Sequence, residues 1–186
     1  MARLIYSAIA SLDGYTADPS GNFDWAAPDA DVHAFVNDLE REAGTYLYGR
    51  RMYETMAVWE TDPSLAEGSE IARDFAEVWQ AADKIVYSTT LRDVTTERTR
   101  IVRSFDAGEI ERLKQDADAD IGIGGPGLAA HAFRAGLVDE YLPVLHPVAV
   151  GDGKSALPRD VFLKLELLDT RRFAGGVAHL RYAIVS

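Results

Sequence analysis

The chain has 186 residues, of which 47% are hydrophobic, and it contains no cysteine. This length and composition suit one compact globular domain over residues 1–186. The formal net charge of −11 argues against nucleic acid or an anionic membrane as a partner, and the lack of cysteine excludes a disulfide framework and thiolate-held metal sites. The first apolar run breaks at Ser11, too early for a signal peptide, so we expect a cytoplasmic protein.

Strand-like and helix-like runs alternate from the N-terminus to about residue 140. The apolar runs predict strands over residues 4–10, 45–48, 84–88, 100–102 and 120–123. Between and after them, the patterns predict helices over residues 30–42, 51–57, 69–81, 107–117 and 126–135. This order is typical of an α/β protein with a mostly parallel central sheet flanked by helices.

The pattern changes after residue 137. An apolar stretch over 140–150, interrupted by two prolines, is followed by strands near 162–169 and 177–185 that are separated by a Gly-Gly turn. These two strands are typical of a C-terminal antiparallel hairpin at the edge of the sheet.

The apolar series within 140–150 is richer than a solvent-facing edge strand tolerates. We therefore expect a homodimer that buries this strand and part of the hairpin. The alternative is that the hairpin and the last helix already cover the series within one chain.

Three strand-to-helix junctions carry residues suited to an anionic ligand. Residues 120–133 contain a formal G-x-G-x-x-G, whose alternative reading is an ordinary tight turn. Arg50 and Arg51 follow Gly49 at a helix start, where the helix dipole disfavours basic residues unless an anion lies there. The alternative is that both arginines are solvated on the surface. Residues 88–90 end a third strand in hydroxyl groups. A dinucleotide laid across the carboxyl ends of parallel strands needs such groups.

The order of these motifs resembles the dihydrofolate reductase superfamily. Residues 11–17, 49–53, 88–90 and 124–128, together with the tail over 165–182, are most similar to the branch that contains the reductase domain of riboflavin biosynthesis, the RibD C-terminal domain. The resemblance covers essentially the whole chain. It implies a dihydrofolate-reductase-like fold and an NADPH-dependent reductase that transfers hydride to a pterin, a flavin precursor or a similar flat heterocycle. A nucleotide-binding or regulatory module with this fold and no turnover is the alternative.

The resemblance also implies roles for individual residues in holding NADPH. Ala8 and Ile9 would flank the nicotinamide, and Gly14 would lie in the loop that covers it. The phosphates would be held by Gly49, Arg50, Arg51 and Met52, and the adenosine side would be contacted by Ser88, Thr89 and Thr90. The pyrophosphate would be held by Gly124, Gly125, Pro126, Gly127 and Leu128.

The proton donor has two candidates. Asp31 lies one helical turn before Phe35 and is similar to the substrate-binding acid of folate reductases, although a helix-capping role explains it equally well. Asp13 lies in the loop after the first strand, where a turn-forming role is the alternative. We also expect Trp25, Phe35 and Tyr53 to contact a flat substrate. The four histidines lack metal-ligand spacing, so no metal is expected.

Overall fold

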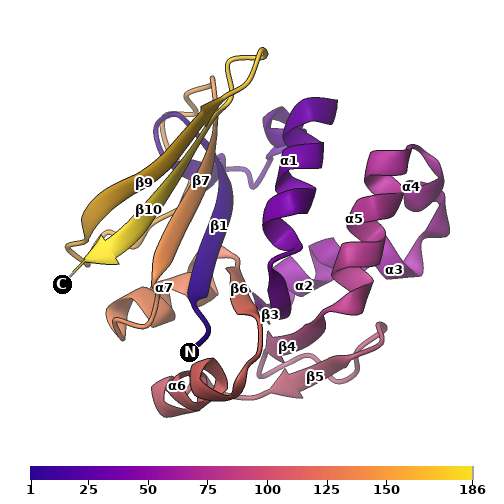
Figure 1. Ribbon diagram of the computed structural model, residues 1–186, viewed down its shortest axis with the longest axis vertical. Helices are drawn as coiled ribbons and strands as arrows, with labels where there is room; N and C mark the ends of the chain where they lie inside the picture. The colour runs from indigo at the N-terminus through magenta and orange to yellow at the C-terminus, as the bar shows by residue number, and fades with distance from the viewer. Residues whose placement is uncertain (186) are drawn as a thin grey trace.

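The computed structural model describes residues 1–185, and eight of its strands form one mixed sheet (Figure 1). Across this sheet the strand order is β5-β4-β3-β6-β1-β7-β10-β9. The strands are β1 (Leu4–Ser11), β3 (Ala43–Gly49), β4 (Asp83–Tyr87), β5 (Thr99–Val102), β6 (Asp120–Gly124), β7 (Glu140–His146), β9 (Lys164–Arg172) and β10 (Ala178–Val185). All pairs from β5 to β7 are parallel, while β10 is antiparallel to both β7 and β9. The predicted α/β class, with its parallel sheet and C-terminal hairpin, is confirmed.

Helices cover both faces of the sheet. They are α1 (Ala30–Glu40), α2 (Arg50–Met56), α3 (Val58–Thr61), α4 (Pro63–Glu67), α5 (Glu70–Ala81), α6 (Ala107–Asp116) and α7 (Pro126–Arg134), with a 3-10 turn η1 (Asp24–Ala26). Side-chain caps define several helix starts: Asp29 accepts a hydrogen bond from the Val32 amide at 2.9 Å, and Ser69 accepts one from the Ala72 amide at 3.0 Å. The short helices α3 and α4 were not predicted, because neither is long enough to show a helical period.

The side chains of β3 divide the core between the two faces of the sheet. Leu47 packs with β6 and α7 residues on one face, whereas Tyr46 and Tyr48 pack with Phe75 and Trp79 of α5 on the other. This separation follows from the two-residue period of a strand. A smaller cluster joins α1 to β7 and to the turn between β9 and β10.

The position of β7 differs from the prediction. It lies between β1 and β10 rather than at an edge, and Tyr141, Leu142 and Val144 are only 6%, 4% and 0% exposed within one chain. The expectation that this strand needs a second copy to cover it is therefore wrong, because β1, β10 and the helices cover it. The edge strand on this side of the sheet is β9, whose Leu167 and Leu168 are 51% and 49% exposed.

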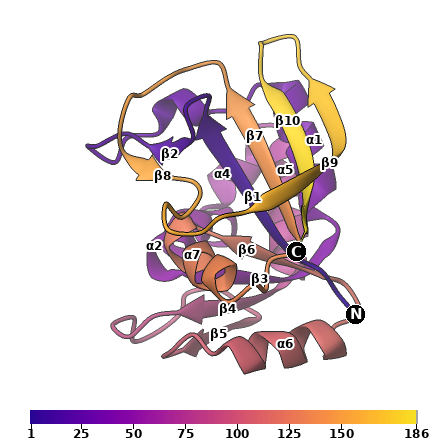
Figure 2. The same cartoon turned by 90° about the vertical axis from the view of Figure 1, so that its left-hand side faces the viewer.

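A separate two-stranded ribbon, β2 (Tyr15–Ala17) with β8 (Lys154–Ser155), stands beside the main sheet (Figure 2). No sequence pattern predicts this ribbon, because two or three paired residues carry no periodicity. Gly153 directly precedes β8 and has φ +139°, and a Cβ there would be 2.1 Å from the Ala17 carbonyl oxygen. Only glycine lets the two segments come this close. Within the described residues, no helix combines the length and the apolar character that a bilayer span requires.

Candidate functional site

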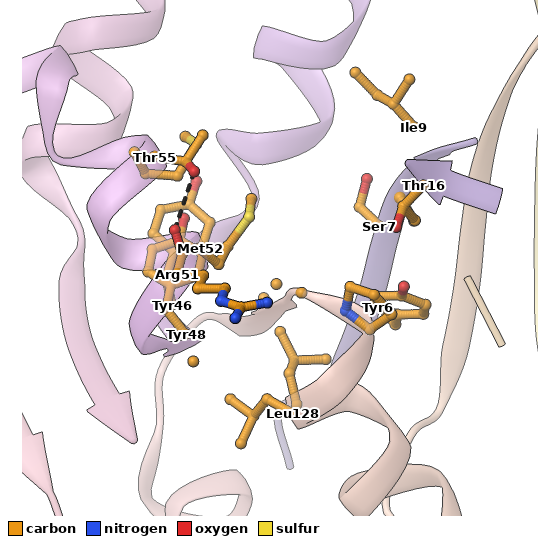
Figure 3. Close-up of a pocket in the computed structure, with 18 of the residues that line it drawn as sticks. Tyr6, Ser7, Ile9, Thr16, Tyr46, Tyr48, Arg51, Met52, Thr55 and Leu128 are labelled. Atoms are coloured by element: carbon orange, nitrogen blue, oxygen red, sulfur yellow. Dashed lines mark hydrogen bonds between the residues drawn. The ribbon is translucent and has the colours of Figure 1, made fainter. Parts of the chain in front are cut away.

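A cleft of about 1640 Å³ opens at the carboxyl ends of β3, β4 and β6 and extends between β1 and α1 (Figure 3). Its walls come from β1, the β2–β8 ribbon, η1, α1, β3, α2, α3, α5, the segments after β4 and β5, and the turn from β6 into α7. Ligand sites in open parallel sheets form at this edge, because the strand ends and the helix starts that follow them meet there.

The glycine turn between β6 and α7 forms one wall of the cleft. Gly125 has φ +88°, a left-handed conformation that suits glycine, and it precedes Pro126 at the first helical position. A Cβ on Gly124 would lie 2.6 Å from the Tyr48 ring, so this glycine makes room for an aromatic side chain. A Cβ on Gly127 would meet nothing within 4 Å. The start of α7 therefore faces open space with unpaired backbone N–H groups, an arrangement that suits an anion.

The two arginines at the start of α2 differ in their surroundings. Arg50 donates a hydrogen bond to Glu54 at 2.7 Å and another to the Thr90 hydroxyl at 3.0 Å. Arg51 extends into the cleft (Figure 3) and forms no ion pair with any residue from 1 to 185. Arg51 is thus the arginine at this junction whose charge is not offset by a carboxylate.

The third junction, after β4, also lines the cleft. Ser88, Thr89 and Thr90 all face it, and the Ser88 hydroxyl accepts a hydrogen bond from the Leu91 amide at 3.0 Å. Arg103 was not among the predicted site residues. It stabilises this loop by donating hydrogen bonds to the Ser88 and Leu91 carbonyl oxygens at 3.0 and 2.5 Å. The structure thus brings together all three predicted junctions.

The other end of the cleft is an aromatic chamber, which we call the substrate-side chamber. It lies on the α1 face of the sheet and adjoins Ser7 and Ile9 of β1. Its lining includes His33, Val36, Leu39 and Glu40 of α1, Tyr46 and Tyr48 of β3, Met52 and Met56 of α2, Trp59 of α3, and Phe75 and Trp79 of α5. Burial lowers the pKa of His33, and burial raises the pKa of Glu40 to about 7.

Among the predicted cofactor residues, Ala8, Ile9, Gly49 to Met52, Ser88 to Thr90 and Gly124 to Leu128 all line the cleft. Gly14 does not. It lies in the turn before β2 with φ +88°, and its carbonyl oxygen accepts a hydrogen bond from the Ala156 amide at 2.9 Å.

None of the five predicted substrate or catalytic residues lines the cleft. Asp31 is exposed in the first turn of α1. Phe35 packs against Phe173 and His179, because it occupies the side of α1 that faces the hairpin. Tyr53 is 2% exposed and its hydroxyl accepts a hydrogen bond from the Thr95 amide at 2.8 Å. Trp25 packs edge-on against His146, although its neighbours in η1 line the cleft.

Asp13 forms a structural clamp. Its carboxylate accepts hydrogen bonds from the Ser11 hydroxyl at 2.6 Å and from the backbone amides of Val150 and Gly151 at 3.2 and 2.7 Å. These bonds lower the pKa of Asp13. The carboxylate thereby ties the loop after β1 to the loop after β7, at the base of the β2–β8 ribbon.

The residues that sequence reasoning missed belong mostly to the substrate-side chamber. Ser7 was predictable in principle, because it shares a strand face with Ile9. Tyr46 and Tyr48 alternate in the same way along β3. One sequence feature could have indicated Glu40: it is an acidic residue in the last turn of a helix, where the helix dipole disfavours negative charge.

Comparisons with known proteins agree with this geometry. The model of the RibD C-terminal domain family matches residues 2–179. The uncharacterized protein YyaP of Bacillus subtilis (strain 168) is 28% identical over 183 residues, which are 97% of this chain and 94% of that protein.

Solved structures show the same fold. A putative riboflavin biosynthesis protein from Shewanella sp. PV-4 superposes with a TM-score of 0.77 at 19% identity over the whole of both chains. Dihydrofolate reductase from Enterococcus faecalis, solved in complex with NADP(H), superposes with a TM-score of 0.64 at 13% identity over 99% of this chain and 97% of that one. The chain therefore belongs to the RibD C-terminal domain family and has a dihydrofolate-reductase-like fold.

Proposed function

We propose that the protein is an NADPH-dependent reductase that transfers hydride to a flat heterocyclic substrate. The observation that carries this proposal is the shape of the cleft: one end gathers three strand-to-helix junctions with glycine, arginine and hydroxyl groups, and the other end is an aromatic chamber. Ala8 and Ile9 of β1 line the cleft, and we place the nicotinamide ring beside them, next to the substrate. The cofactor supplies hydride, while the chain binds both partners and excludes water between them. The E. faecalis reductase structure with NADP(H) supports this choice of cofactor.

The first experiment titrates the protein with NADPH and follows nicotinamide fluorescence, then follows NADPH oxidation with pterins, folates and flavin precursors. Saturable binding with oxidation supports the reductase. Saturable binding without oxidation by any of these substrates favours the alternative, a nucleotide-binding or regulatory module. Absence of saturable binding contradicts both.

We predict a preference for NADPH over NADH, supplied mainly by Arg51. A charge-assisted contact to a phosphate contributes about 1.5–3 kcal/mol, so Arg51→Ala should weaken NADPH binding roughly tenfold or more and leave NADH binding nearly unchanged. Arg50→Ala should have a smaller effect, because Glu54 already offsets its charge. Arg134→Ala, which removes a surface pair with Asp160, is the control. Equal wild-type affinity for the two cofactors contradicts the prediction.

We also propose a homodimer, now through the edge strand β9 rather than through β7. The support is the exposure of Leu167 and Leu168 on an unpaired strand edge. Sedimentation at micromolar concentration should give twice the 20.4 kDa mass of one chain, and Leu167→Lys with Leu168→Lys should give the monomer. A wild-type monomer would contradict the dimer and leave the cofactor proposal untouched.

A further inference from the structure

Lys84 is a lysine inside the protein core, next to the substrate-side chamber. It lies on β4, its side chain is 0% exposed, and it shares a strand face with Val86, which packs in the core under α5. Burial lowers the pKa of its ammonium group, because the charged form loses its hydration. An apolar side chain of similar length would fill the same place without this cost. The ammonium group therefore calls for an explanation beyond packing.

The ammonium group of Lys84 caps the end of α5. It donates hydrogen bonds to the backbone carbonyl oxygens of Trp79 and Gln80 at 3.3 and 3.4 Å. These carbonyls belong to the last turn of α5, which contains no basic residue of its own. A cation at this place also offsets the negative end of the helix dipole. The backbone of Trp79 is thus tied to β4 through Lys84.

The same group fixes the ring of Trp79. The Lys84 Nζ atom lies 4.3 Å from the centroid of that ring, within the range of a cation–π contact. The ring nitrogen of Trp79 donates a hydrogen bond to the Tyr48 hydroxyl at 3.2 Å. Both Trp79 and Tyr48 line the chamber, and Trp79 is only 1% exposed. The orientation of this wall residue therefore depends on one cation and one hydrogen bond.

Lys84 also links this wall to α3. Its ammonium group is 3.9 Å from Glu60 Oε2, an atom without a hydrogen-bond partner among residues 1–185. The other oxygen of Glu60 accepts a hydrogen bond from the Glu97 amide at 2.6 Å. Glu60 directly follows Trp59, whose carbonyl oxygen accepts a hydrogen bond from the Gln80 side chain at 2.8 Å. Since Trp59 lines the chamber as well, two wall tryptophans from two helices are connected through one buried cation.

We propose that Lys84 is a positioning residue of the substrate-side chamber. Its ammonium group holds Trp79 and Trp59 in one rigid aromatic wall, against which the flat ring of the substrate stacks. Lys84 does not line the cleft itself, so it acts through these side chains. A buried ion that contacts several elements specifies one arrangement of them, which an apolar core leaves freer. The inference rests on the proposed function for the nature of the ligand, whereas the rigidity of the wall does not depend on it.

Fluorine NMR of protein labelled with 5-fluorotryptophan tests the wall without any ligand. The chain has three tryptophans, so Trp25, Trp59 and Trp79 give three resonances, which single phenylalanine replacements assign. Lys84→Met keeps the length of the side chain and removes its charge. We expect it to shift or split the Trp59 resonance by more than the line width, although the ammonium group covers the Trp79 ring and not the Trp59 ring. The Trp25 resonance should stay in place.

Lumazine, a neutral and flat pteridine, tests the effect on a ligand. Its dissociation constant is measured by calorimetry on protein saturated with NADP⁺. We expect Lys84→Met to weaken lumazine binding roughly tenfold or more, because stacking contacts with two tryptophans are lost, and to change the NADPH dissociation constant by less than about twofold.

Lys114→Met is the matched control. Lys114 is also a buried lysine, which donates a hydrogen bond to the Leu137 carbonyl oxygen at 3.0 Å and pairs with Asp139, but it lies outside the cleft lining. This variant should lose stability and keep the tryptophan resonances and both affinities of the wild type.

A folded Lys84→Met variant with an unchanged Trp59 resonance would overturn the inference, as would equal losses of lumazine and NADPH affinity. If Lys84→Met does not fold, Lys84→Gln takes its place, and failure of both variants to fold would show a purely structural role and overturn the inference too. The tryptophan resonances need neither cofactor nor substrate. A Trp59 shift confined to the Lys84 variants therefore supports the inference even if the protein binds no NADPH, which separates this test from failure of the reductase proposal.

Discussion

Gly127→Val is expected to abolish NADPH binding and leave the protein folded. Gly127 is in the first turn of α7 and faces the cleft, and its added Cβ would meet no protein atom within 4 Å. The valine side chain would therefore occupy the space in front of the helix N-terminus, where we place the pyrophosphate. Losing those hydrogen bonds costs about 3 kcal/mol or more, which is at least roughly 100-fold in affinity.

Three measurements check this prediction: the dissociation constant of NADPH, the circular dichroism spectrum and the melting temperature. Ala130→Val places the same side chain on the same helix at a position outside the cleft lining, and it should leave the affinity unchanged. Gly125→Val should lose both affinity and stability, because φ is +88° there and a side chain would add strain of about 1–2 kcal/mol. A folded Gly127→Val variant with wild-type affinity would show that this turn does not hold the cofactor.

Glu40→Gln is expected to make the protein more stable at pH 8 and to change its stability little at pH 4. Burial raises the folded-state pKa of Glu40 to about 7, whereas an unfolded glutamate titrates near 4.3. The folded protein thus holds this proton more tightly, so the stabilisation is full below about pH 4 and is lost as the pH rises through 7. The difference between the two pKa values corresponds to about 4 kcal/mol. Glutamine does not titrate and avoids this loss.

Urea unfolding of the wild type and of Glu40→Gln at several pH values between 4 and 8 measures the effect. The difference in unfolding free energy between them should grow toward pH 8. Asp38→Asn should not show this growth, because its carboxylate is exposed. A difference that stays constant with pH would mean that Glu40 is ionised throughout this range in the folded protein.

Local sequence patterns predict most of the fold because most elements carry their own period. The strands β1, β3, β4, β5 and β6 and the longer helices α1, α5, α6 and α7 are within about two residues of their predicted bounds, whereas β7 ends four residues before its predicted end. The β2–β8 ribbon is different, because it joins segments near residues 16 and 154 through only a few backbone contacts. Its existence depends on the surrounding tertiary structure.

In the candidate site, too, one part can be predicted from local sequence and the other part depends on tertiary structure. The cofactor end of the cleft can be predicted from the glycine, arginine and hydroxyl residues at the strand ends. At each strand end, the turn and the side chains that would bind the cofactor lie in one short stretch of sequence. The chamber is made by side chains from separate elements, and Glu40 in sequence resembles any polar residue of a solvated helix. Burial raises its pKa, and hydrogen bonds from the side chains of Ser7 and Tyr46, which lie on two different strands, lower it. Asp31 and Phe35 had the right spacing on α1, but the rotation of that helix directs them elsewhere.

The position of β1 in the sheet also determines when the sheet can be completed during synthesis. The first strand pairs with β6 on one side, where Leu4 is opposite Ile121, and with β7 on the other, where Ser11 is opposite His146. A nascent chain that has reached residue 100 contains β3, β4 and half of β5 but neither neighbour of β1, so an apolar eight-residue strand stays unpaired. Such late, long-range pairing slows folding and exposes the strand to association with other chains. The ribosome must therefore deliver about four-fifths of the protein before its central strand is paired on both edges.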